Sequence, residues 1–273
     1  MRDVIESIKH PTIAAAREAL GEAGAGRASC FAVEGPKLLL EAIAAEAPIT
    51  RAFFLHPRAE AEEPSWEAAQ RAGIEAWLVK RGVFSRLLGL GYETATRVLT
   101  VVTITRAPLE ELLAVVTGDT CLLAGERIQD PRNVGVLIRT ADAWGLKAIA
   151  FTEGSADAFS RASVRSTTGS ILRVRVTAGV GTAELLRGLR ERSVRVIGTS
   201  AGATEAPWSV KMARPCAIVV GNESEGLTEE ARDLCDVMTR IPMYGGAHSF
   251  NVTVAAGMLL YEAARQQGVR SES

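Results

Sequence analysis

Short apolar segments typical of β-strands alternate with segments of helical periodicity along the second half of the chain. Strands that alternate with helices form a mainly parallel sheet with helices on both faces. We therefore predict an α/β domain with strands at 121–124, 148–151, 172–176, 195–199, 217–220 and 237–241. Its main helices are expected at 133–144, 182–191 and 251–266, where apolar residues recur every three or four positions.

The first hundred residues show the same alternation on a smaller scale. Strands are predicted at 30–33, 51–55, 76–79 and 97–104, and helices at 12–20, 36–45, 64–72 and 81–88. Pro36 and Pro64 begin two of these helices, where the missing N–H costs no hydrogen bond. The sequence thus predicts a smaller N-terminal α/β domain (1–105), a linker with a short helix (106–117) and a C-terminal domain (118–273), the two domains being of ordinary size.

Polar residues and glycines follow the predicted strands, and the carboxyl ends of parallel strands are where such sheets bind ligands. After the strand at 121–124, Asn133 is expected to cap a helix that exposes Arg139. The sequence GNESEGL places Glu223 after the strand at 217–220, and Ser249 and Asn251 begin the last helix, where free N–H groups can bind an anion. On these residues alone, helix capping and a tight turn remain alternative explanations.

The charge is nearly balanced overall but uneven along the chain. The sequence has 31 Lys and Arg against 32 Asp and Glu, which argues against a wholly basic nucleic-acid binder. Between positions 127 and 175, however, eight cations stand against four acids, and Arg161 and Arg165 share a face if their segment is helical. This stretch favours contact with phosphates, although a solvated basic helix has the same pattern.

Several common signatures are absent from the sequence. It contains neither CxxC nor HExxH, so we predict no metal site. A complete GxGxxG after a strand, a GxxxxGK[ST] loop and a GxSxG elbow are also absent, so a P-loop nucleotidase is excluded. We see no signal peptide and no apolar run of about 18 residues, and we therefore expect a cytoplasmic protein with no membrane partner.

Three segments taken together resemble the ordered motifs of the SpoU/TrmH family, the RNA ribose 2′-O-methyltransferases of the SPOUT class. They are NVGVLIRT with Asn133 and Arg139, GNESEGL with Glu223, and IPMYGGAHSFNVTVAAGMLLYEA with Ser249 and Asn251. The segment FAVEGPKLLLEA also resembles the small ribosomal-protein-like RNA-binding domain found in many members. The sequence departs from the family at Phe250, where Leu is usual, and in the MYGGAH loop, which leaves the role of His248 open.

The resemblance implies a parallel sheet with a deep trefoil knot, bound S-adenosyl-L-methionine and a homodimer formed through the C-terminal domain. It implies that Arg139 orients the ribose hydroxyl, that Asn133 and Glu223 hold the loops, and that Ser249 and Asn251 complete the catalytic pocket. The expected cofactor-binding residues are Thr199, Gly221, Asn222, Ile241, Met243, Ser249 and Phe250. The expected RNA contacts are Arg132, Arg161 and Arg165.

The implied reaction is methylation of a ribose 2′-hydroxyl in structured RNA, with ribosomal RNA as the expected substrate. Transfer RNA is an alternative substrate, and a non-catalytic RNA-binding or ribosome-assembly protein on the same fold is an alternative function. An enzyme is favoured because the sequence retains all five expected catalytic residues: Asn133, Arg139, Glu223, Ser249 and Asn251. Arg is protonated at ordinary pH, so an orienting and charge-stabilising role suits Arg139 better than that of a general base.

Overall fold

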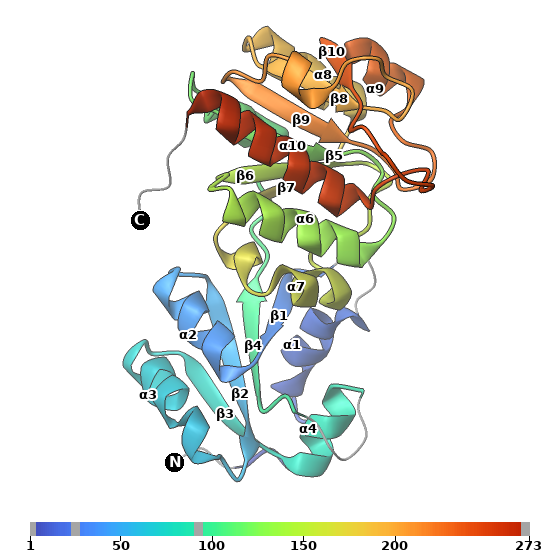
Figure 1. Ribbon diagram of the computed structural model, residues 1–273. Coiled ribbons are helices and arrows are strands. Elements are labelled where there is room, and N and C mark those ends of the chain that lie inside the picture. The colour runs from blue at the N-terminus through green and yellow to red at the C-terminus, as the bar shows by residue number, and fades with distance from the viewer. Residues whose placement is uncertain (1–3, 23–27, 90–94, 269–273) are drawn as a thin grey trace. The chain divides into compact units, whose positions relative to one another are not determined.

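The computed structural model describes residues 4–22, 28–89 and 95–268, and it divides the chain into two compact units (Figure 1). Unit 1 comprises Met1–Thr105 and Phe159–Arg173, and unit 2 comprises Arg106–Ala158 and Val174–Ser273. The expected α/β class, with a smaller N-terminal part and a mainly parallel C-terminal sheet, is confirmed. Within the described residues, no helix is long and apolar enough to cross a membrane.

The sheet of unit 1 has the order β1-β4-β2-β3 and is mixed. Strand β4 pairs antiparallel with β1 and β2, while β3 pairs parallel with β2. The strands are β1 (Cys30–Glu34), β2 (Ile49–His56), β3 (Glu75–Lys80) and β4 (Val98–Thr103). The α-helices are α1 (Ile13–Arg17), α2 (Pro36–Ala44), α3 (Glu63–Arg71) and α4 (Arg81–Leu87), with a wide helical turn at Glu18–Glu22 and a 3-10 turn at Glu60–Glu62.

Both faces of this sheet are covered because successive side chains of a strand point to opposite sides. Phe53 packs with Ile13 of α1 and Phe84 of α4, whereas its neighbour Phe54 packs with Leu39 of α2. Both phenylalanines are fully buried. The two adjacent aromatic residues of β2 therefore anchor two separate helical layers of unit 1.

Unit 1 also contains a segment from the middle of the chain, Phe159–Arg173. Its helix α7 (Arg161–Thr167) packs beside β1, and Phe159 contacts Phe31 with ring centroids 5.6 Å apart. Arg161 Nε lies 2.8 Å from Glu34 Oε1, and its Nη1 donates to the carbonyl of Leu88 at 2.7 Å. These contacts make the segment an integral part of unit 1.

The predicted strand at 172–176 was wrong at its start. Ser170–Leu172 forms a 3-10 turn, and the strand begins at Arg175. Arg173 and Arg175 are both exposed and flank the buried Val174, so exposed and buried side chains alternate before the strand itself begins. Arg173 Nη1 also lies 2.9 Å from Glu41 Oε2, within unit 1.

Unit 2 contains six strands in the order β10-β8-β9-β5-β6-β7, and every pairing in this sheet is parallel. The strands are β5 (Cys121–Gly125), β6 (Ala148–Thr152), β7 (Arg175–Val180), β8 (Arg195–Thr199), β9 (Cys216–Val220) and β10 (Val237–Thr239). The helices are α5 (Leu109–Ala114), α6 (Pro131–Ala143), α8 (Thr182–Glu191), α9 (Glu229–Leu234) and α10 (Val252–Gln267), with a 3-10 turn at Pro207–Ser209. The trefoil knot stays a prediction.

Helices cover both faces of this sheet, as Figure 1 shows. Leu185 and Leu189 of α8 pack with Leu112 of α5 on one face, together with Ala124 and Val219 of the central strands. On the other face α6 and α10 lie side by side, with α6 packed against β6 and α10 against β9. The predicted linker thus carries a helix whose buried leucines belong to the core of unit 2, and α9 is a helix that the sequence did not predict.

We expect Arg161→Met to destabilise the protein by about 1–3 kcal/mol, because it leaves the Glu34 carboxylate, 8% exposed, without its nearest cation. Arg165→Met is the matched control on the same helix, since its Nη1 is 3.9 Å from Glu34 and its side chain is 59% exposed. Urea unfolding of the two variants measures the difference. Equal, small effects would show that the Arg161 pair does not stabilise this segment.

Candidate functional site

A cavity of about 510 Å³ lies at the carboxyl ends of β8, β9 and β10 in unit 2. Its walls come from the loops that leave these strands and from the start of α10. All seven residues expected to hold a cofactor line it: Thr199, Gly221, Asn222, Ile241, Met243, Ser249 and Phe250. Glu223, Asn251 and His248 line it as well. The parallel sheet therefore gathers three sequence-distant loops around one space.

Loop 221–227 forms one wall of the cavity and closes on itself. The N–H of Asn222 donates to the carbonyl of Gly226, and the N–H of Gly226 donates back to Asn222. Gly226 has a φ of +70°, a left-handed conformation that suits glycine. A Cβ at Gly221 would meet the backbone of Gly226 at 2.3 Å, so no larger residue fits there. Gly221 is thus required by the close approach of the two limbs of the loop, and Gly226 is favoured by its left-handed backbone.

Glu223, Asn133 and Asn251 form a hydrogen-bonded chain at the edge of the cavity. Asn133 Nδ2 donates to Glu223 Oε1 at 2.8 Å, and Asn251 Nδ2 donates to Asn133 Oδ1 at 3.3 Å. Glu223 also accepts from the N–H groups of Gln129 and Asp130, at 3.1 and 3.2 Å. This chain connects the start of α6, loop 221–227 and the start of α10, which are the three segments singled out in the sequence.

The pKa of Glu223 is lowered, although the causes oppose one another. Partial desolvation raises it, while hydrogen bonds from the Asn133 side chain and from the N–H groups of Gln129, Asp130 and Glu223 itself lower it and prevail. Glu223 is therefore a carboxylate at neutral pH. It acts as a hydrogen-bond acceptor that fixes Asn133, and it is poorly suited to accept a proton there.

The helix starts at this site differ from prediction in one respect. Helix α6 begins at Pro131 and is capped by Asp130, whose Oδ1 accepts from the N–H of Arg132 at 2.8 Å. Asn133 lies inside the first turn, where its side chain is free to bind Glu223, so its predicted role as the cap was wrong. Asn251 caps α10, as the alternative explanation had it, because its Oδ1 accepts from the N–H of Thr253 at 2.8 Å.

Arg139 does not line the cavity. It is exposed on α6, six residues after Asn133, and six residues correspond to about 240° around a helix, so the two side chains leave different faces. Within the described residues it has no hydrogen-bond or ion-pair partner, which leaves its guanidinium available to a substrate. The structure thus joins Asn133, Glu223 and Asn251 and places Ser249 in the cavity wall, with Arg139 farther along α6.

The three residues expected to contact RNA all have partners in the chain. Arg132 is 78% exposed and pairs with Asp130 at 2.8 Å. Arg161 is bound to Glu34 and Leu88 within unit 1, while Arg165 approaches Glu34 more loosely and stays 59% exposed. Arg132 and Arg165 are therefore the more accessible of the three.

Sequence reasoning missed Glu126, a carboxylate that is only 1% exposed at the end of β5. Its Oε1 accepts from the hydroxyls of Thr182 and Thr228 at 3.1 and 2.6 Å, and its Oε2 accepts from the N–H of Thr228 at 2.9 Å. These threonines stand at the starts of α8 and α9, where helix dipoles favour negative charge. An acid directly after a buried strand was the available signal.

The fold and site define an α/β protein of the SPOUT methyltransferase type, with a ligand cavity at one edge of a parallel sheet. Residues 121–261 match the model of the SpoU rRNA Methylase family. The chain belongs to this family, as the sequence predicted. Within the described residues, no group of three or more His, Cys, Asp or Glu side chains could hold a metal ion.

Two relatives are named 23S rRNA (guanosine-2′-O-)-methyltransferase RlmB. The protein from Nitrosomonas europaea is 36% identical over 61% of this chain and 64% of its own length. The one from Xylella fastidiosa is 33% identical over 74% of this chain and 82% of its own length. The chain thus spans slightly less than two thirds of the first relative.

Solved structures match almost the whole chain. AdoMet-bound rRNA methyltransferase from Sinorhizobium meliloti is 25% identical, with a TM-score of 0.84 over 96% of this chain and 97% of its own. An RNA 2′-O ribose methyltransferase is 27% identical, with a TM-score of 0.79 over 98% of this chain and 100% of its own. The likeness therefore includes the N-terminal part as well as the family domain.

We expect Glu223→Gln to lower the free energy of unfolding at pH 7 by about 1 kcal/mol. The amide NH2 that replaces one carboxylate oxygen cannot accept a hydrogen bond from the N–H groups around it. Water screens part of the loss, because Glu223 is exposed. Since the pKa is lowered in the folded protein, the carboxylate stabilises it above the ordinary value of 4.5. That contribution disappears as the pH falls through the lowered pKa.

Urea unfolding between pH 7 and the acid limit of the native state measures this difference. Glu191→Gln, at an exposed position of α8, is the control and should change stability by less than about 0.5 kcal/mol. A Glu223→Gln effect that stays constant down to the acid limit would contradict the assigned hydrogen bonds.

Proposed function

We propose that the chain is an S-adenosylmethionine-dependent methyltransferase that modifies a ribose 2′-hydroxyl in ribosomal RNA. The observation that carries this proposal is the cavity of unit 2, which all seven expected cofactor residues line and which the Asn133–Glu223–Asn251 chain borders. The ribosomal substrate is supported by the names of the RlmB relatives and of the Sinorhizobium structure. Transfer RNA is the alternative that the assay below distinguishes.

The cavity suits S-adenosylmethionine in size and chemistry. Its volume lies within the range of small-molecule sites, about 300–1,000 Å³. The wall contains Leu227, Ile241 and Met243, which suit an aromatic base, and the carboxylate of Glu223, which suits a cation. The cofactor supplies a methyl group on a positively charged sulfur, from which an oxygen nucleophile can take it.

The residues of the chain contribute chiefly by holding the two reactants in the correct orientation. Such positioning can lower the activation barrier of a reaction between two molecules by about 7–11 kcal/mol. Glu223 holds Asn133, and Asn133 in turn binds Asn251 beside Ser249, so that the cavity edge has a fixed shape. A guanidinium is a hydrogen-bond donor and a poor general base. We assign Arg139 to orienting the RNA and stabilising negative charge on the ribose oxygen.

A homodimer through α10 belongs to the same proposal. Ala256, Leu259 and Leu260 of this helix are buried in unit 2, but Val254, Met258 and Tyr261 are 46%, 41% and 60% exposed. Spacings of four and three residues place these three on one face. An exposed apolar stripe on the last helix supports packing against a second copy. We also propose a cytoplasmic location, because the cofactor and the RNA substrate are intracellular.

We expect the purified protein to transfer methyl groups from labelled S-adenosylmethionine to a ribose 2′-hydroxyl of ribosomal RNA, and not of transfer RNA, as measured by nucleoside analysis.

Arg139→Ala should lower kcat/KM at least about 100-fold while S-adenosylmethionine binding stays unchanged, because an oriented charge near the reacting oxygen contributes roughly that factor. Arg139→Lys tests whether charge alone suffices.

A protein that binds the cofactor but gives no 2′-O-methyl product in either RNA would disprove the enzymatic proposal. Full activity of Arg139→Ala would instead disprove only the role of that arginine. Methylation of transfer RNA alone would show that transfer RNA, and not ribosomal RNA, is the substrate.

For the dimer, we expect Met258→Glu to convert a wild-type dimer into a monomer, because a charge would have to be buried in the interface. Val115→Glu places the same charge at another exposed apolar residue of unit 2 and should leave the dimer intact. Sedimentation velocity measures both variants. A monomeric wild-type protein would contradict this part of the proposal.

A further inference from the structure

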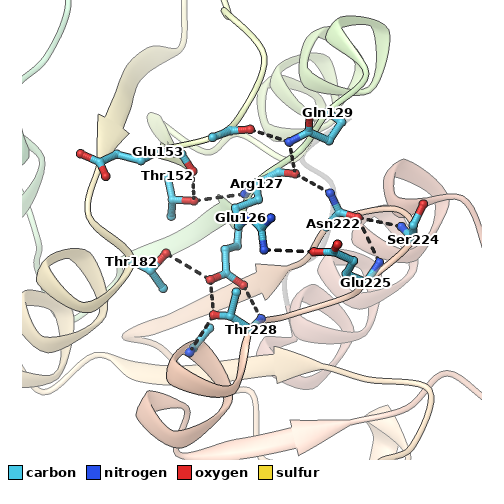
Figure 2. A network of polar contacts seen from close by, with 12 residues as sticks. Glu126, Arg127, Gln129, Thr152, Glu153, Thr182, Asn222, Ser224, Glu225 and Thr228 are labelled. Carbon is cyan, nitrogen blue, oxygen red and sulfur yellow. Dashed lines mark hydrogen bonds and ion pairs between the residues drawn. The ribbon is translucent and has the colours of Figure 1, made fainter.

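Arg127 follows β5 at the carboxyl edge of the sheet in unit 2, where it contacts the end of β6 and loop 221–227 (Figure 2). Its N–H donates to Oγ1 of Thr152, the last residue of β6, at 3.1 Å, and its side-chain stem lies along Gly154 in the turn that follows. Its φ is +53°, a left-handed conformation that is uncommon for a residue other than glycine. The surrounding contacts therefore hold this backbone against its own preference.

The same residue binds loop 221–227 at two points (Figure 2). The carbonyl of Arg127 accepts from Asn222 Nδ2 at 2.9 Å, and Arg127 Nη1 pairs with Glu225 Oε2 at 3.0 Å. Asn222 Oδ1 accepts from the N–H groups of Ser224 and Glu225 at 2.9 and 3.0 Å. Arg127 thus contacts both the first limb and the tip of the loop.

Every residue from Gly221 to Leu227 lines the cavity, whereas Arg127 does not. Any effect of Arg127 on a ligand must therefore pass through the loop. Glu225 is the connection to the Arg127 side chain, because its carboxylate pairs with the guanidinium and the residue forms part of the wall; Asn222, also in the wall, binds only the Arg127 carbonyl.

We infer that Arg127 is a positioning residue whose ion pair with Glu225 holds loop 221–227 in the conformation that receives S-adenosylmethionine. The identity of the ligand rests on the proposed function, while the control of the loop rests on the contacts above. The side chains of the pair are 42% and 65% exposed, so its contribution is moderate and decreases with added salt.

The test is a double-mutant cycle on binding of S-adenosylmethionine, measured by calorimetry. Arg127→Met and Glu225→Gln should each raise the Kd about threefold to fivefold, the most that an exposed ion pair generally contributes. The double variant should have a Kd no higher than that of either single variant, because the two residues act through one contact. Arg127→Lys keeps the charge and should recover part of the affinity.

Arg190→Met is the matched control. Arg190 pairs with Asp236 at 3.3 Å with a similar exposure of 46% and 30%, but it lies outside the cavity wall. It should leave the Kd unchanged. Wild-type affinity in Arg127→Met, or effects that multiply in the double variant, would overturn the inference.

Hydrogen exchange of the ligand-free protein separates this inference from the proposed function. Arg127→Met should speed exchange of the Ser224 and Glu225 amides, while the amides of α8 stay unchanged. A wild-type protein that does not bind S-adenosylmethionine would refute the proposed cofactor and the ligand named here. Unchanged exchange in Arg127→Met would refute control of the loop by Arg127, whatever the ligand.

Discussion

The parallel pairing of β10, β8, β9 and β5 is the constraint on which the rest of unit 2 depends. It brings four carboxyl ends to one edge, and hydrogen bonding continues past the strands themselves. The N–H of Glu126 donates to Val220 at 2.8 Å, and that of Ser200 donates to Thr239 at 3.0 Å. Each loop therefore leaves the sheet from a fixed point, and the cavity forms between these points.

Much of this architecture could be predicted from local pattern. Helix α8 (Thr182–Glu191) and strand β8 (Arg195–Thr199) have the predicted bounds, because apolar residues repeat clearly in both segments. The family motifs then pointed to the cavity, since all the expected cofactor residues line one space. The sequence predicted these segments correctly because their burial follows from the local repeat of apolar residues in a strand or a helix.

Prediction failed where a distant contact or a helix end decided the structure. The helix predicted at 133–144 starts earlier, at Pro131, because proline is favoured in a first turn, and Asp130 takes the cap. The segment Phe159–Arg173 lies in unit 1 because Glu34 and Glu41, more than 120 residues earlier, bind its arginines. Neither pairing has a signal in the local sequence.

Glu126 and Arg127, the two residues that follow β5, stabilise different parts of the site. Among the residues that the structure describes, Glu126 has no ion-pair partner; its buried carboxyl oxygens accept from two hydroxyls and one N–H, so it belongs to the rigid frame. Arg127 lies at the surface of that frame and reaches Glu225 through an exposed contact. A buried network resists change because an unmet hydrogen bond is costly, whereas an exposed ion pair opens at little cost. The hydrogen bonds of Glu126 therefore hold the frame more firmly than the Arg127–Glu225 pair holds the tip of loop 221–227.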